Sequence, residues 1–246
     1  MSNEGQGKRD LFGLAAYGET LNTLAKGAVD GAGAFLSRIC LPAAEEFGLL
    51  LRDKVSAWRA TNAVAIAQEA EQILISHDSG NVHAHPRLVM KILSEGSWSD
   101  DEKVKSFWAG LLASSCTEDG KDESNVIFLN ILSQITSLQA KIIEYGCTHA
   151  PVKLSQHGLL YAEKLEVTIQ AIMDIVKSED LHRIDRELDH LRSLEIIGGT
   201  MAGGGIGMES GIADITPSPL ALQMYSRCKG HSGPPEHFYT IGKDLT

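Results

Sequence analysis

The sequence predicts a mainly α-helical protein with a small β-hairpin in its C-terminal part. Apolar residues recur three and four positions apart through most of the 246 residues, which is the spacing of one buried helix face. Near the C-terminus, a glycine-rich stretch separates two short apolar runs, a pattern typical of two strands joined by a loop. We expect four parts: a disordered lead-in (1–10), a helical body (11–135), an α+β module (136–230) and a tail (231–246).

Composition narrows the class of function before any motif is considered. The net charge of −10 argues against broad nucleic-acid binding, because neutralising phosphates requires clustered Lys and Arg. We expect no signal peptide and no membrane span, since the first residues are polar and no uncharged apolar run reaches about 18 residues. The cysteines form no C-x-x-C pair, so we expect reduced thiols in the cytoplasm: Cys40, Cys116, Cys147 and Cys228.

Residues 11–41 are rich in Gly and Ala and allow two interpretations. Each glycine lowers helix propensity by about 1 kcal/mol relative to Ala, so this segment needs a packing partner to be helical. We favour a helical hairpin docked on the protein or on a second copy, and we expect a homo-oligomer that forms through residues 11–60. The alternative is an amphipathic helix that makes peripheral contact with a membrane when the protein is activated.

Two helices and a loop are expected to follow. Pro42 suits a helix start, and the spacing predicts one helix that ends near Ala60 and a second over 61–76. Turn residues then predict a loop up to Pro86, where a short helix begins. This loop carries the best metal candidates, His77, Asp78, His83 and His85. Their spacing matches no zinc signature, so we expect a solvated loop with no metal and no cofactor; metal binding stays an open alternative.

The strongest helix prediction covers residues 99–116. Ser99 and Glu102 have the spacing of a capping box, in which a hydroxyl and a carboxylate satisfy free backbone amides. Two large aromatic residues in the helix can anchor a core. The apolar stripe consists of Val104, Phe107, Trp108, Leu111, Leu112 and Ser115.

This helix also carries a resemblance to a known family. The run D-D-E-K-V-K-S-F-W-A-G-L-L-A-S-S, which begins at Asp100, resembles the D-E-E-L-R-x-x-F-A-x-L-L-A-S-A segment of the Abi-alpha (abortive infection alpha) family. The resemblance continues at 126–145, 188–199 and 215–228. Those bacterial proteins are linked to abortive infection, a defence against phage. The resemblance therefore implies a defence role here, without implying a catalytic residue.

The module at 136–230 is predicted to be a winged helix, with three helices, a β-hairpin and a closing helix. Asp180 is expected to cap the third helix, and the glycine-rich residues 198–211 would form the wing. The expected elements are helices from Thr136, over 165–176 and from Asp180 to Leu194, strands at 195–197 and 212–215, and a helix from Thr216–Pro217 to Cys228.

Charge argues against DNA binding by this module. Between Glu179 and Glu195, six acidic residues outnumber three arginines, whereas a base-reading helix normally lies among phosphate-contacting cations. We therefore expect Arg183, Arg186 and Arg192 to contact a protein partner. A winged-helix transcriptional regulator is kept as a further alternative.

The sequence carries no recognisable catalytic motif. The glycine-rich stretch lacks the G-K-[ST] of a phosphate loop, and no G-x-S-x-G occurs in the chain. We predict a non-enzymatic component of phage defence that acts in the cytoplasm through protein–protein contacts and self-assembly. The main alternative is a membrane-active effector that uses residues 11–41.

Overall fold

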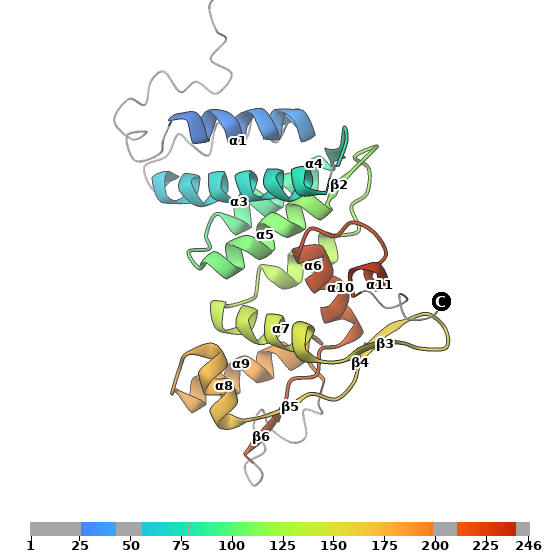
Figure 1. Ribbon diagram of the computed structural model, residues 1–246. Coiled ribbons are helices and arrows are strands. Elements are labelled where there is room, and N and C mark those ends of the chain that lie inside the picture. Colours follow the sequence, from blue (N-terminus) through green and yellow to red (C-terminus); the bar gives the residue numbers. More distant parts are fainter. Residues whose placement is uncertain (1–25, 43–55, 78, 199–210, 240–246) are drawn as a thin grey trace, which may run out of the picture.

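The computed structural model describes residues 26–42, 56–77, 79–198 and 211–239. This part of the chain is mainly helical and contains small two-stranded antiparallel sheets (Figure 1). The prediction of a mainly α-helical protein is confirmed. The expected lead-in (1–10), the start of the 11–41 segment and most of the expected wing lie outside the described residues.

Helix α5 (Glu102–Ser114) lies at the centre of the structure. It packs against α3 (Ser56–Ser76), α4 (Pro86–Gly96), α7 (Ser137–His149) and α10 (Pro219–Cys228). Every residue from Phe107 to Ser114 is therefore buried, and not only those along the predicted stripe.

The N-cap of α5 is Asp101, whose carboxylate accepts hydrogen bonds from the backbone amides of Lys103 and Val104. The capping box predicted for Ser99 is wrong. Ser99 belongs to the turn that closes α4, and its amide donates to the carbonyl of Gly96.

Helices α1 (Lys26–Ile39), α3 and α5 are stacked in layers (Figure 1). The face of α1 that meets α3 is apolar and buried, and consists of Val29, Ala32, Phe35, Leu36 and Ile39. Helix α3 runs without a break, so the predicted helix boundary at residues 60–61 is wrong. The segment contains no Gly or Pro to end a helix there, and Ala60 and Asn62 are buried.

The expected loop at 76–86 contains a short strand, β1 (His83–Ala84). It pairs antiparallel with β2 (Cys116–Thr117), which follows α5. Beyond β2 come α6 (Val126–Leu132) and α7. Thr136 and Gln139 form a capping box at the start of α7, which confirms Thr136 as the start of the predicted helix.

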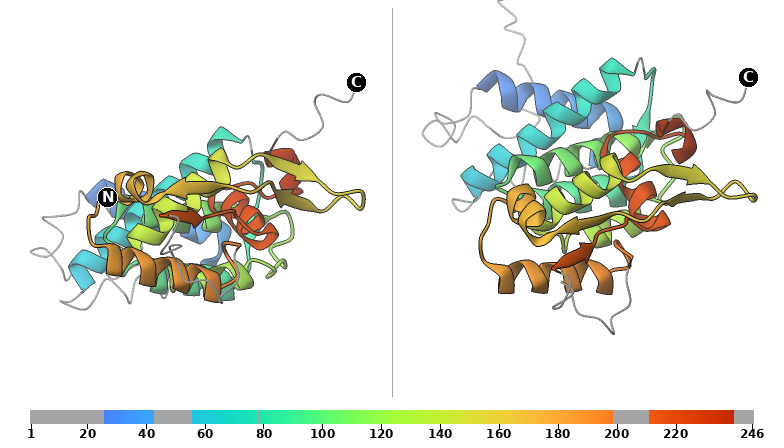
Figure 2. Two further views of the ribbon diagram at one scale, coloured as in Figure 1. Left: turned by 90° about the horizontal axis from the view of Figure 1, so that it is seen from below. Right: turned by 60° about the horizontal axis from the view of Figure 1, so that its bottom comes forward.

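The chain after α7 forms a hairpin that the sequence did not suggest. Strands β3 (Val152–Leu154) and β4 (Leu160–Ala162) pair with each other and project from the helices (Figure 1, Figure 2). Next come β5 (Glu166–Thr168), α8 (Ile169–Val176) and α9 (Leu181–Ser193). The predicted helix at 165–176 therefore begins later, after a strand. Asp180 caps α9 as predicted.

The hairpin predicted for 195–197 and 212–215 has the wrong strand pairing. Strand β6 (Ile212–Asp214) pairs with β5, while Ile197 makes only an isolated bridge with Pro217. Glu195 has a φ of 58°, and this left-handed backbone interrupts an extended strand. Val167 and Ala213 are opposite each other and both buried, which explains why β5 is the partner. The winged-helix assignment is not confirmed by these pairings.

Helix α10 begins at Ser218 as N-cap, slightly later than predicted. The expected tail at 231–246 is partly folded, because α11 (Pro235–Phe238) packs on α10. One hydrophobic core includes residues from both sides of position 135, so the division into body and module stays a prediction. Within the described residues, no helix has the length and apolar character needed to cross a bilayer.

Candidate functional site

The residues proposed as metal candidates are spread over different elements. His77 directly follows α3, His83 is in β1, and His85 caps α4 by accepting a hydrogen bond from the amide of Arg87 at its Nδ1 (3.3 Å). Asp78 lies outside the described residues. Among those that are described, no group of three or more His, Cys, Asp or Glu side chains is placed to share a metal ion.

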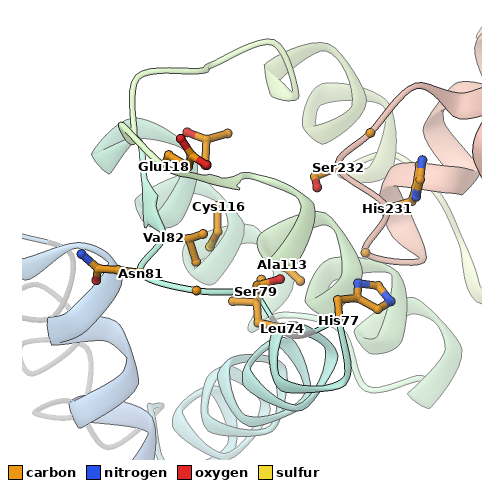
Figure 3. A pocket seen from close by; sticks show the side chains of 14 residues that line it. Leu74, His77, Ser79, Asn81, Val82, Ala113, Cys116, Glu118, His231 and Ser232 are labelled. Carbon is orange, nitrogen blue, oxygen red and sulfur yellow. The ribbon is translucent and has the colours of Figure 1, made fainter.

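An open pocket of about 910 Å³ lies beside this loop (Figure 3). Its walls come from the end of α3 and the loop after it, from the end of α5 with β2, and from the turn that follows α10. Gly230, with a φ of 83°, lets that turn approach α3: a Cβ there would lie 2.3 Å from Cγ2 of Ile73. The polar side chains of the lining include His77, Ser79, Asn81, Glu118, His231 and Ser232, which Figure 3 labels.

Cys116 lines the pocket but is not an activated nucleophile. Burial raises the pKa of its thiol to about 12, so the thiol stays protonated at neutral pH. The Sγ atom donates a weak hydrogen bond to the carbonyl of Leu112 (3.4 Å). The pocket therefore offers hydrogen-bonding groups and a buried thiol, an arrangement that suits binding better than nucleophilic catalysis.

Two exposed tryptophans form a second candidate site at the other end of α5. Trp58 and Trp98 are 43% and 54% exposed, and their ring centroids lie 6.3 Å apart. The guanidinium of Arg59 lies 4.1 Å from the centroid of the Trp98 ring, and Nε1 of Trp58 donates to Oδ1 of Asp100 (3.2 Å). We call Trp58, Arg59, Trp98 and Asp100 the tryptophan surface.

The tryptophan surface has the composition of a protein contact. Trp and Arg carry a large share of the binding energy in protein interfaces, whereas most exposed positions of a monomer are polar. Arg59 is already ordered, because its Nε donates to Oγ of Ser97 (3.0 Å). Such a surface loses little side-chain entropy when a partner covers it.

The model of the abortive infection alpha family matches residues 60–200. The chain belongs to this family. Membership implies a role in abortive infection, a bacterial defence against phage. No curated protein and no solved structure matches the chain significantly.

The family match covers some of the candidate residues and leaves others outside. It includes α9 and most of the pocket, while Trp58 and the turn after α10 lie beyond it. The pocket of this family member therefore combines residues from inside and outside the matched segment.

The arginines predicted to contact a partner differ in their exposure. Arg183 and Arg186 are exposed on α9, and Arg183 forms an ion pair with Glu187 (3.6 Å). Arg192 is buried; its guanidinium donates to Asp189 Oδ1 (3.2 Å) and to the carbonyl of Asp214. Arg192 thus joins α9 to β6, and of the three arginines only Arg183 and Arg186 are exposed to solvent.

The sequence analysis predicted neither the pocket nor the tryptophan surface, for different reasons. The pocket joins three segments that are tens of residues apart, and periodicity reports only local structure. The tryptophan surface left one local signal: Trp98 stands between Ser97 and Ser99, in a polar turn where a large aromatic residue is unexpected.

Proposed function

We propose that this protein is a non-enzymatic component of abortive infection that acts by binding proteins, including a second copy of itself. The observation that carries this proposal is the tryptophan surface. It presents two large aromatic rings and an ordered guanidinium to solvent, which is the composition of an interface hot spot.

A second copy of the chain is the occupant that we propose for this surface. Trp58 lies within residues 11–60, the part of the chain for which the small residues suggested self-assembly. The surface also carries both signs of charge, because Asp100 lies beside Trp58 and Arg59 lies beside Trp98. Two charges of opposite sign favour a self-complementary contact, since a two-fold axis brings the same patch onto itself.

Light scattering on the purified full chain tests this proposal. At micromolar concentration we expect an oligomer. The W58A/W98A double variant should weaken self-association and raise the dissociation constant of the oligomer about tenfold or more. I127A is the matched control, because Ile127 is also exposed but lies on α6. In bacteria, W58A/W98A should lose phage protection while I127A keeps it.

Several outcomes would contradict the proposal. A wild-type monomer, or an oligomer that the double variant leaves intact, would exclude self-assembly through this surface. Turnover of nucleotides, nucleic acid or peptide bonds by the pure protein would exclude a non-enzymatic role.

We also infer that residues 136–230 form a winged-helix module that contacts protein and not DNA. After the β3–β4 hairpin that follows α7, the order β5, α8, α9, β6 and the pairing of β5 with β6 support the arrangement. Six acidic residues around α9 and the burial of Arg192 disfavour contact with phosphates.

A membrane-active role for residues 11–41 receives no support from the described part of that segment. The apolar residues of α1, including Phe35 and Leu36, are buried against the body and would have to leave it before they could meet a bilayer. We propose the cytoplasm as the place of action, which four cysteines present as free thiols support.

A further inference from the structure

The pocket beside α3, α5 and α10 plays no part in the proposed self-assembly, since the tryptophan surface lies at the other end of α5. We propose that this pocket binds a small organic cation with more than one primary amine, of the polyamine class. The proposal rests on the electrostatics of the pocket walls and on the shape of the lining.

The C-terminal ends of α3, α5 and α10 meet at the pocket. Leu74 and His77 come from the end of α3, Ala113 and Cys116 from the end of α5, and Gly230 from the turn after α10. Figure 1 places these three helix ends on the same side of the molecule. The C-terminal end of a helix carries the negative end of its dipole and favours a cation within the last turn.

The side chains that line the pocket provide hydrogen-bond acceptors in addition to the negative ends of the helix dipoles. Glu118 contributes a carboxylate, and Asn81, Ser79 and Ser232 contribute neutral oxygens. Because the carbonyl of Pro234 can only accept, Nε2 of His231 is the donor in their 2.9 Å hydrogen bond, which leaves Nδ1 as the acceptor of a neutral ring. Among the lining residues that the structure describes, none is Lys or Arg.

Two basic residues, Arg227 and Lys229, lie close to the turn that lines the pocket, and both are engaged. Lys229 forms an ion pair with Glu144 (3.1 Å), and Nη1 of Arg227 donates to the carbonyl of His231 (3.0 Å). The net charge of −10 further raises the local concentration of cations around the whole molecule.

The arrangement of the lining selects a ligand with more than one amine. Glu118 and the two histidines stand on different sides of the pocket (Figure 3). Between them lie the apolar side chains of Leu74, Val82 and Ala113, which suit a chain of methylene groups. A volume of about 910 Å³ exceeds what one ammonium group needs and lies in the range of small-molecule sites.

Isothermal titration calorimetry on the full-length protein tests the proposal, with spermidine as the probe. We expect saturable binding at one site, much weaker binding of butylamine, and persistence of the spermidine signal when the ionic strength is matched with NaCl. S232W should fill the pocket and weaken binding at least tenfold; Ser232 is exposed in the turn, so the fold tolerates the larger side chain. E118Q should weaken binding roughly two- to fivefold, as expected for an exposed ion pair.

E95Q is the matched control, because Glu95 is also exposed but lies near the C-terminal end of α4, at the tryptophan-surface end of α5. E95Q should leave the affinity for spermidine unchanged. W98A should also leave it unchanged, and this result would show that spermidine binding does not depend on the proposed self-assembly. Circular dichroism checks that every variant is folded.

Three results would overturn the proposal. The first is the absence of saturable binding. The second is equal weakening by E118Q and E95Q, which would mean diffuse attraction to an acidic protein. The third is binding of a lysine-containing peptide without binding of spermidine, which would assign the pocket to the side chain of a protein partner.

Discussion

Glu144 is an example of a half-buried charge that joins separate helices. It lies on α7 and forms ion pairs with Lys103 of α5 and with Lys229 at the end of α10 (3.1 Å for Lys229). Lys229 also lies 5.3 Å and 5.5 Å from the ring centroids of Tyr225 and Phe107. Burial raises the pKa of Glu144, but the hydrogen bonds from the two lysines outweigh it and lower the pKa overall.

This lowered pKa predicts a pH-dependent contribution to stability. The contribution of Glu144 is fully present above the ordinary value of 4.5 and is lost as the pH falls through its lower folded-state pKa. E144Q should reduce the free energy of unfolding by roughly 1 kcal/mol at pH 7, and the difference from wild type should shrink below pH 4.5. Urea denaturation of both proteins, from pH 7 to below pH 4.5, measures this difference in the free energy of unfolding. E123Q, which breaks an exposed pair with Arg87, should have a much smaller effect.

The N-cap of α5 gives a second prediction at the residue scale. D101A should lower the free energy of unfolding by about 1 kcal/mol, because two backbone amides lose their acceptor. S99A should change it by less than about 0.5 kcal/mol. Equal effects of both variants in thermal or urea denaturation would mean that Ser99 does cap the helix.

At the scale of elements, the contact between α5 and α10 depends on the absence of a side chain. A Cβ at Gly110 would lie 1.9 Å from the carbonyl oxygen of Cys228. Gly110 therefore sets how closely the end of α10 approaches α5, and with it the position of the turn that lines the pocket.

G110A is accordingly expected to be strongly destabilising. Alanine favours a helix by up to about 1 kcal/mol over glycine, but a clash with backbone cannot be relieved by a rotamer change, so we expect a net loss of about 3 kcal/mol. G31A in α1 is the matched control: its Cβ would meet nothing within 4 Å, so it should be neutral or stabilising. A neutral G110A in urea denaturation would contradict the close approach.

At the scale of the whole molecule, α5 separates two candidate sites. The tryptophan surface lies at its N-terminal end and the acceptor-lined pocket at its C-terminal end. Helices α3 and α10 both pack on α5, and the end of α3 and the turn after α10 line the pocket. A ligand in the pocket would therefore contact the elements that hold the core together.

The sequence alone determined the helical class, the family and several helix starts. Periodicity, capping at Thr136 and Asp180, and the apolar run of α5 are local properties, so residues near each other in the chain are enough to reveal them. Two predictions were wrong because local patterns carry no information on tertiary neighbours. The helix break predicted at residue 60 and the cap predicted at Ser99 both depend on contacts with distant parts of the chain.

Only the tertiary structure decided the strand partners and both candidate sites. Strand β5 pairs with β6 across α8 and α9. The pocket joins α3, α5 and the turn after α10, and Trp58 of α3 meets Trp98 in the turn after α4. Each of these contacts links residues about 40 or more positions apart. Long-range packing of this kind is governed by shape and burial in three dimensions, which a periodic pattern of apolar residues does not encode.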